Sequence, residues 1–187
     1  YMMDYTERTL RKINGYKGVI VDVDLDRVSL PDGKEALREV VSHPGGVGII
    51  AIDGDGSAIC VRQFRYCFRE HLLEIPAGKL EHGEDPMDCA VRELSEETGI
   101  SAGHIVPLGS IYPSPGFCRE VLYLYLATEL KQGEAHPDAG EFLDIVRVPF
   151  GELVDKCMSG EIRDGKTVAA ALKAKIYLDT QGAGKEI

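Results

Sequence analysis

The amino-acid sequence predicts an α+β protein in which a mixed β-sheet lies between helices and a small antiparallel β-sheet precedes it. Strand patterns dominate roughly the first forty residues, whereas strand and helix patterns alternate afterwards, which is typical of a mixed sheet covered on both faces. The turn residues Asp53-Gly54-Asp55-Gly56 between two apolar runs indicate a hairpin in that sheet. We therefore expect two domains, residues 1–43 and 44–187, divided at His43-Pro44-Gly45-Gly46.

In the first domain, residues 5–14 carry a weak signal for a short helix or a lead-in. Residues 18–25 alternate apolar and polar, as a half-buried strand does, and a strand near residues 27–30 turns at 31–33 into another at 35–41. In the second domain we expect strands at residues 47–52, 58–64, 72–75, 105–112, 121–130 and 142–148, and helices at 85–98, 150–158 and 166–178.

Composition excludes several classes of protein. The 187 residues are 44% hydrophobic and 28% charged, which is typical of a globular protein with a packed core. A net charge of −10 argues against nucleic-acid binding. No apolar run has the length of a membrane span, and residues 1–11 lack the apolar centre of a signal peptide, so we expect no membrane contact and a cytoplasmic location. Five cysteines without a C-x-x-C pair predict free thiols.

The helix at residues 85–98 has clear boundary signals. Asp85 is a capping residue, Pro86 suits the first helical position, and Gly99 suits a left-handed C-terminal cap. Three apolar residues of this helix lie three or four positions apart: Met87, Val91 and Leu94. We expect them to form an apolar stripe that faces the core.

The same helix carries Glu93, Glu96 and Glu97, whose spacings of three and four place the carboxylates on one surface. A solvated acidic face is the ordinary explanation of such a run. A metal site is favoured because Arg92 is the one cation nearby in the helix and because the loop Pro76-Ala77-Gly78 precedes it and can bring backbone carbonyls to the same place. Converging hard oxygen ligands suit Mg²⁺.

Residues 78–100, GKLEHGEDPMDCAVRELSEETGI, resemble the Nudix box. Every defining position matches: Gly78, Glu84, Arg92, Glu93, Leu94, Glu96, Glu97, Gly99 and Ile100. Agreement by chance is on the order of 10⁻⁹ per start position, so the signal is specific. The resemblance implies a Nudix fold and the hydrolysis of a nucleoside diphosphate linked to another group.

The resemblance also implies a metal site and roles for its residues. It assigns Mg²⁺, with Mn²⁺ as a substitute, to the carboxylates of Glu93, Glu96 and Glu97 and the carbonyl of Ala77. Glu93 and Glu97 are thereby catalytic as well. Arg92 is expected to orient a glutamate or to tie the loop to the helix rather than to touch the substrate.

Features outside the box resemble the ADP-ribose pyrophosphatase branch of the family. They are the segments 62–65 (RQFR), 74–78 (EIPAG) and 114–117 (SPGF), together with the N-terminal sheet. The branch implies cleavage of ADP-ribose to AMP and ribose 5-phosphate. The alternatives are another nucleoside diphosphate sugar or NADH as substrate, or a non-catalytic sensor that binds ADP-ribose.

The resemblance implies that five residues contact the substrate. Arg65 is matched to the arginine that contacts the diphosphate, for which a planar fork is well suited. Arg38 and Glu39 lie where the branch reaches the adenine or the dimer-related site. Pro115 is matched to a proline associated with ADP-ribose specificity, and Phe117 packs either on a ring of the substrate or in the core.

The catalytic base of this branch usually lies in a late acidic loop, here residues 136–142. Glu141 fits that position best, and Asp138 is the alternative. A second acidic position after the SPGF segment falls on Glu120, and the neighbouring Arg119 departs from the pattern of the branch.

The first forty or so residues are too few to bury a core by themselves. They must therefore dock on the rest of the chain or on a second copy. The resemblance favours a homodimer whose sites contain residues of both subunits, acting on a small-molecule nucleoside diphosphate sugar.

Overall fold

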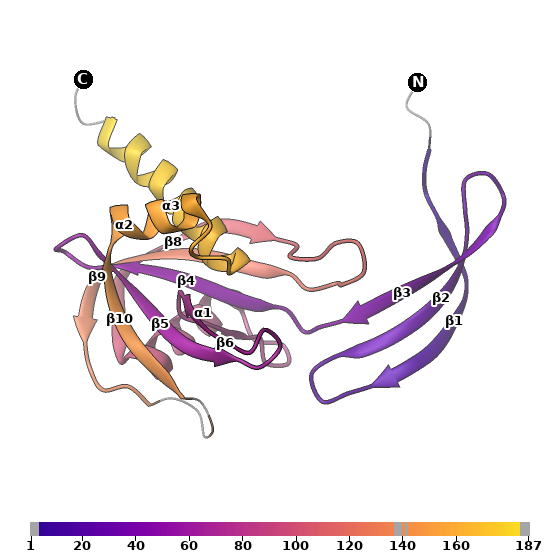
Figure 1. Cartoon of the computed structure of the whole chain (residues 1–187), viewed down its shortest axis with the longest axis horizontal. Coiled ribbons are helices and arrows are strands. Elements are labelled where there is room, and N and C mark those ends of the chain that lie inside the picture. Colours follow the sequence, from indigo (N-terminus) through magenta and orange to yellow (C-terminus); the bar gives the residue numbers. More distant parts are fainter. Residues whose placement is uncertain (1–3, 137–139, 141, 184–187) are drawn as a thin grey trace. The chain divides into compact units, whose positions relative to one another are not determined.

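The computed structural model describes residues 4–136, 140 and 142–183 (Figure 1). Its contacts divide the chain into two compact units. Unit 1 consists of Tyr1–Gly45 and Tyr112–Val121, and unit 2 consists of Gly46–Ile111 and Leu122–Ile187.

Unit 1 contains a three-stranded antiparallel sheet in the order β1-β2-β3. Its strands are β1 (Arg8–Lys17), β2 (Asp22–Ser29) and β3 (Glu35–Ser42). The helix considered at residues 5–14 is wrong, because β1 there pairs along the whole of β2. The two short strands expected at 18–25 and 27–30 are one strand, β2, since both neighbours bond it without interruption from Asp22 to Ser29.

A second part of unit 1, Tyr112–Val121, lies beside the end of β3. The Val41 amide donates to the Phe117 carbonyl at 2.7 Å, and the Arg119 amide donates to the Val41 carbonyl at 2.9 Å. The predicted boundary at residue 43 does not include this distant segment. The division into domains 1–43 and 44–187 therefore stays a prediction.

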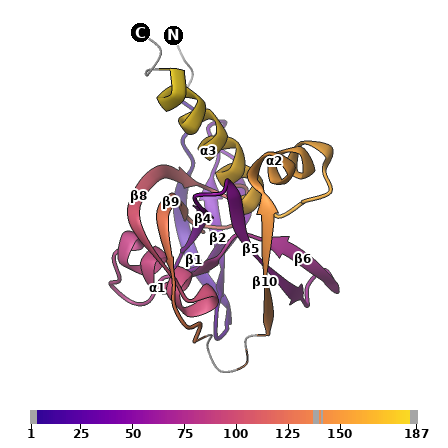
Figure 2. The same cartoon turned by 90° about the vertical axis from the view of Figure 1, so that its left-hand side faces the viewer.

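Unit 2 is built on a seven-stranded mixed sheet with the order β10-β5-β4-β9-β8 (Figure 2). β6 also pairs with β5, β7 pairs with β4, and β4 runs parallel to β9. The strands are β4 (Gly46–Ile52), β5 (Ser57–Arg65), β6 (Glu70–Glu74), β7 (Ala77–Lys79), β8 (Ile100–Ile111), β9 (Leu122–Gln132) and β10 (Leu143–Pro149). The predicted hairpin at residues 53–56 is confirmed between β4 and β5.

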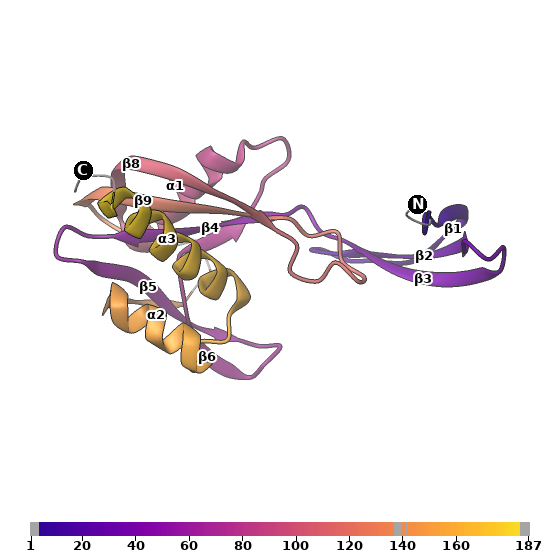
Figure 3. The same cartoon turned by 90° about the horizontal axis from the view of Figure 1, so that it is seen from above.

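Helices cover both faces of this sheet (Figure 3). They are α1 (Pro86–Thr98), α2 (Phe150–Ser159) and α3 (Gly165–Ala183). Alternation along β4 separates two cores, because Ile49 packs in the cluster that contains Leu94 of α1, whereas Ile50 packs in the cluster that contains Leu153 of α2 and Ala170 of α3. The predicted mixed sheet between helices is confirmed.

Among the described helices, none has both the length and the apolar character that crossing a membrane requires. All five cysteines are free thiols, as predicted.

Candidate active site

Helix α1 begins and ends where its sequence predicts. The Asp85 side chain accepts a hydrogen bond from the Met87 amide at 2.8 Å, and Pro86 occupies the first turn. Gly99 ends the helix with φ 70°, and its amide donates to the Ser95 carbonyl at 2.8 Å. These caps fix the start and the register of the glutamate-bearing turns.

The buried face of α1 includes carboxylates. Leu94 packs in the core as predicted, with Met87 partly buried beside it. Val91 is 44% exposed, so its place in the predicted apolar stripe is wrong. The buried face is rotated toward Glu93 and Glu97, which are 9% and 3% exposed, and this leaves Val91 at its edge.

Strand β7 holds these two buried glutamates against its backbone. The Ala77 amide donates to Oε2 of Glu97 at 3.1 Å. At Gly78, an added Cβ would lie 1.8 Å from the carboxyl carbon of Glu93. The glycine is therefore required by the close approach of backbone and carboxylate.

Arg92 donates hydrogen bonds to three carboxylates around the helix. It donates from Nε to Glu84 at 2.8 Å and from Nη1 to Glu93 at 2.9 Å and to Glu96 at 2.8 Å. The hydrogen bond from Arg92 lowers the pKa of Glu84 to about 2, and the same contact raises the pKa of Arg92. Arg92 thus orients glutamates and ties the loop at Glu84 to the helix, as predicted.

The carboxylate side chains on α1 are of the chemical type that binds a divalent cation. Glu93, Glu96 and Glu97 project from adjacent turns, and carboxylates are the ligands that Mg²⁺ prefers. Across residues 4–136, 140 and 142–183, no three His, Cys, Asp or Glu side chains are arranged as a group that could hold a metal ion. Arg92 holds Glu93 and Glu96 instead. The three carboxylates are therefore suitable ligands for a divalent cation. Such a cation would have to compete with Arg92 for Glu93 and Glu96.

Arg65, at the end of β5, is partly buried. Its Nε and Nη2 donate to the two carboxylate oxygens of Glu74 at 2.7 and 2.6 Å. The Glu74 contact is the largest of the effects that raise the pKa of Arg65, and the charges of Asp164 and Glu97 contribute further. Arg65 therefore lies within electrostatic reach of the α1 carboxylates, and its contact with substrate stays a prediction.

The other substrate contacts expected from the sequence lie in unit 1. Arg38 is paired with Glu7, with Nε to Oε2 at 2.9 Å, and Glu39 is exposed on β3. Pro115 is exposed, and Phe117 is 57% exposed, so of the two alternatives for Phe117 the one that places it in the core is wrong. Their roles toward substrate stay predictions.

Glu120 and Arg119, the two positions singled out after the SPGF segment, both lie close to side chains of unit 1. Glu120 lies 3.4 Å from Nδ1 of His43, and Arg119 lies 3.9 Å from Asp24. The candidate bases Glu141 and Asp138 lie outside the described residues.

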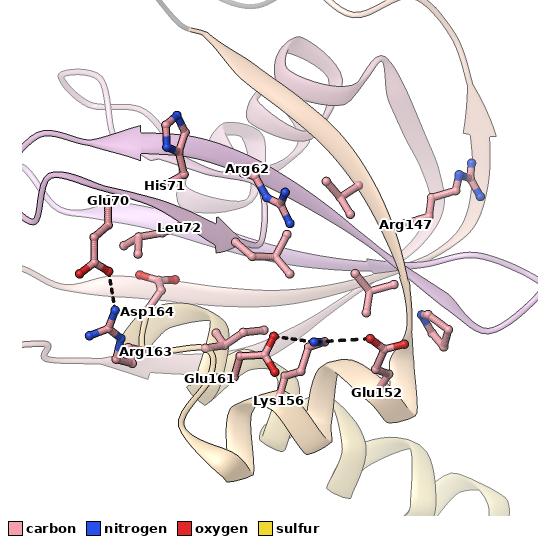
Figure 4. Close-up of a pocket in the computed structure, with 15 residues that line it drawn as sticks. Arg62, Glu70, His71, Leu72, Arg147, Glu152, Lys156, Glu161, Arg163 and Asp164 are labelled. Atoms are coloured by element: carbon pink, nitrogen blue, oxygen red, sulfur yellow. Dashed lines mark hydrogen bonds and ion pairs between the residues drawn. The ribbon is translucent and has the colours of Figure 1, made fainter.

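A cavity of about 500 Å³ lies on the opposite face of the sheet from α1, beside α2 (Figure 4). Arg163 there pairs with Glu70, and Lys156 pairs with Glu152 and Glu161. The cavity is lined by residues 62, 70–73, 146–149, 152, 156 and 161–164, and none of them belongs to α1. The cavity is therefore separate from the glutamate site.

Sequence reasoning missed Glu74 and Lys166. Glu74 is 1% exposed and bonds both Arg65 and Lys166 of α3. The signal for Glu74 was a charged residue within the apolar run at residues 72–75. Lys166 carried no comparable signal, because its contact depends on a fold that joins residues 92 positions apart.

Comparisons with known proteins agree with this arrangement. A model of the NUDIX domain matches residues 42–172, and the chain belongs to this family. An ADP-ribose pyrophosphatase of Bacillus subtilis (strain 168) is 38% identical over 171 residues, which cover 90% of this chain and 92% of that protein. A methanol dehydrogenase activator of Bacillus methanolicus is 39% identical over 183 residues, 97% of each chain.

A solved structure of an ADP compounds hydrolase has a TM-score of 0.86 with 20% identity. The match covers 97% of this chain and 99% of that one. This likeness confirms the fold expected from the sequence.

Proposed function

We propose that the chain hydrolyses the diphosphate of ADP-ribose to give AMP and ribose 5-phosphate in the presence of Mg²⁺. The observation that carries this proposal is the packing of Glu93 and Glu97 against Gly78 and Ala77 within a complete Nudix box. The extensive similarity to an ADP-ribose pyrophosphatase supports the choice of substrate.

Glu93, Glu96, Glu97 and the Ala77 carbonyl would hold the divalent cations, and Mn²⁺ would be able to replace Mg²⁺. Bound there, the cations would supply positive charge that offsets the negative charge of the diphosphate. The protein's own contribution is to orient Glu97 through the Ala77 amide and to keep Glu93 and Glu96 paired with Arg92, a pairing that a bound cation would replace.

Other residues position substrate and water. Arg65 binds a diphosphate oxygen pair with the edge of its guanidinium that Glu74 does not use. Glu141 accepts a proton from the attacking water, and Asp138 is the alternative base.

A substrate panel tests the proposal. With Mg²⁺ present, the initial rates for ADP-ribose, ADP-glucose, GDP-mannose, NADH and Ap4A are compared by chromatography of the products. The highest kcat/KM is expected for ADP-ribose, with AMP as a product. A higher kcat/KM for GDP-mannose or NADH would assign the site to that substrate instead. Tight binding of ADP-ribose without turnover would identify a sensor.

A second candidate function is activation of a methanol dehydrogenase, because the relative with that name matches nearly the whole chain. The test adds this chain to a purified methanol dehydrogenase with NAD⁺ and methanol. A rise in the dehydrogenase rate that Glu97→Gln abolishes would support activation through the Nudix site. An unchanged rate excludes this candidate for the dehydrogenase used.

The N-terminal sheet is proposed to form a homodimer interface, with Arg38, Glu39, Pro115 and Phe117 contributing to substrate sites. Large apolar side chains on β1, β3 and the β1–β2 turn are exposed; they are Leu10, Tyr16, Val19, Ile20 and Leu37. In addition, Oδ1 of the buried Asp26 has no hydrogen-bond partner within the described part of the chain. Both features favour a second copy as the cover for this sheet. The cytoplasmic location stays a prediction.

A further inference from the structure

Unit 2 contains a buried ionic network that links β5, β6 and α3. Glu74, the last residue of β6, accepts hydrogen bonds from Arg65 at 2.7 and 2.6 Å and from Nζ of Lys166. Lys166 is 9% exposed and also pairs with Asp164 at 3.0 Å. Two cations and two anions therefore alternate along one chain of contacts.

The α3 end of this network is held rigidly. Asp164 accepts from the amide and the hydroxyl of Thr167 at 3.0 and 2.6 Å, which caps the start of α3. The Thr167 hydroxyl in turn accepts from the amide of Ile75 at 3.0 Å. The residue next to Glu74 is thus tied to the same helical turn that presents Lys166.

The Arg65 end of the network is linked to the glutamate site through the backbone, because Glu74 precedes Ala77 by three residues and the Ala77 amide donates to Oε2 of Glu97 at 3.1 Å. A guanidinium carries more N–H groups than one carboxylate accepts, and within the described residues Glu74 takes only the Nε and Nη2 side of Arg65. The side chain is 40% exposed, and Glu97 is one of the charges that raise its pKa. Glu74 therefore leaves the Nη1 edge of Arg65 for a further acceptor.

We propose that Glu74 is a positioning residue that presents Arg65 to the substrate diphosphate, and that Lys166 of α3 holds Glu74 in place. The inference rests on the proposed function, because it assigns the supports of the arginine that binds the diphosphate. Without Glu74, the long Arg65 side chain would have to be ordered by the substrate at an entropic cost. Lys166 matters because a buried carboxylate needs a second fixed partner to keep one orientation.

A purely structural ion network is the competing explanation, and a double-mutant cycle separates the two. The full chain is assayed with Mg²⁺ and ADP-ribose as wild type, Arg65→Ala, Glu74→Gln and the double variant. We expect Arg65→Ala to lower kcat/KM about 100-fold and Glu74→Gln to lower it about 10-fold, chiefly by raising KM. In the Arg65→Ala background, Glu74→Gln should have no further effect.

Two matched variants control for nonspecific damage. Arg62→Gln changes an arginine of the same strand that lines the cavity on the other face, and Glu70→Gln removes the surface pair with Arg163 (Figure 4). Both should keep the kcat/KM of the wild type. Lys166→Met should raise KM in the same direction as Glu74→Gln. If Glu74→Gln fails to fold, Glu74→Gln/Lys166→Met removes both buried charges and takes its place in the cycle.

The cycle also distinguishes failure of this inference from failure of the proposed function. If Glu74→Gln lowers kcat/KM equally with and without Arg65, or leaves KM unchanged, Glu74 does not act through Arg65 and the inference is overturned. If the wild type prefers another diphosphate, the cycle is run with that substrate and the same criteria hold. If it hydrolyses none, the proposed function fails, and calorimetric affinities for ADP-ribose across the cycle decide the inference by the same coupling.

Discussion

The backbone at Gly78 and the carboxylate of Glu93 approach so closely that a Cβ at Gly78 would lie 1.8 Å from the carboxyl carbon. Two atoms cannot be that close, so Gly78→Ala must displace Glu93. We expect kcat to fall about 100-fold, the scale on which a misplaced charge acts in catalysis. The measurement is the rate of AMP release from ADP-ribose with saturating Mg²⁺.

Gly54→Ala is the matched control for Gly78→Ala. Gly54 lies in the β4–β5 turn, and an added Cβ there meets no atom within 4 Å. It should retain the wild-type rate. An active Gly78→Ala enzyme would show that Glu93 tolerates displacement and does not bind the metal in the proposed way.

Glu97→Gln should lower kcat about 10³-fold or more while leaving the thermal midpoint unchanged or slightly higher. The amide oxygen of glutamine still accepts the hydrogen bond from Ala77, so the fold keeps that contact. It cannot supply the negative charge that a divalent cation requires. Asp88→Asn, at an exposed position of the same helix, should be neutral in both measurements. A near-normal rate in Glu97→Gln would remove this residue from the metal site.

Glu141→Gln should lower kcat about 10²–10⁴-fold, as loss of a general base does. Mg²⁺ affinity, measured by titration calorimetry, should remain that of the wild type because the α1 carboxylates are intact. Asp138→Asn is the comparison. If Asp138→Asn is the damaging change and Glu141→Gln is silent, Asp138 is the base. If both are silent, neither residue is.

The low pKa of Glu84 predicts a pH dependence of stability. Because the pKa falls from 4.5 to about 2 through the hydrogen bond from Arg92, ionised Glu84 stabilises the folded state fully above pH 4.5. That contribution is lost as the pH decreases toward about 2. The difference in thermal midpoint between wild type and Glu84→Gln should therefore be constant from neutral pH to 4.5 and shrink below it. A difference that does not change with pH would show that Glu84 and Arg92 are not paired in solution.

Deletion of residues 1–43 should abolish dimerisation and weaken ADP-ribose binding together. Sedimentation velocity measures the first effect and calorimetry the second. The deletion also removes the Val41 backbone contacts of residues 117 and 119, so a point variant is the sharper probe. Arg38→Gln should weaken ADP-ribose binding in an intact dimer, whereas Arg27→Gln, which loses an exposed pair with Glu35 on the same sheet, should not. A fully active monomer at micromolar concentration would contradict the dimeric site.

The sequence predicts best those parts of the fold that are determined by residues close together along the chain. The caps Asp85 and Gly99 and the hairpin at residues 53–56 follow from local backbone preferences, and the structure has them where expected. β1 was missed because its residues show no clear alternation, and the pairing with β2 decides their conformation.

In the candidate site, too, the sequence predicts the local features and not the contacts between distant parts of the chain. The spacing of Glu93, Glu96 and Glu97 placed them together because a helix has a fixed period. The burial of Glu93 and Glu97 was not predictable from that spacing, since it depends on the approach of β7. The contact of Glu74 with Lys166 joins residues 92 positions apart, and only the complete fold reveals it.

The discontinuity of unit 1 has a consequence for the growing chain. During synthesis, β1, β2 and β3 leave the ribosome well before Tyr112–Val121, which completes their unit. Until then, the Val41 amide and carbonyl lack their bonds to residues 117 and 119, and the outer edge of β3 is open there. An open strand edge can pair with another nascent chain. While β4 to β8 are being translated, this edge can therefore pair with the same edge of a neighbouring chain on the polysome.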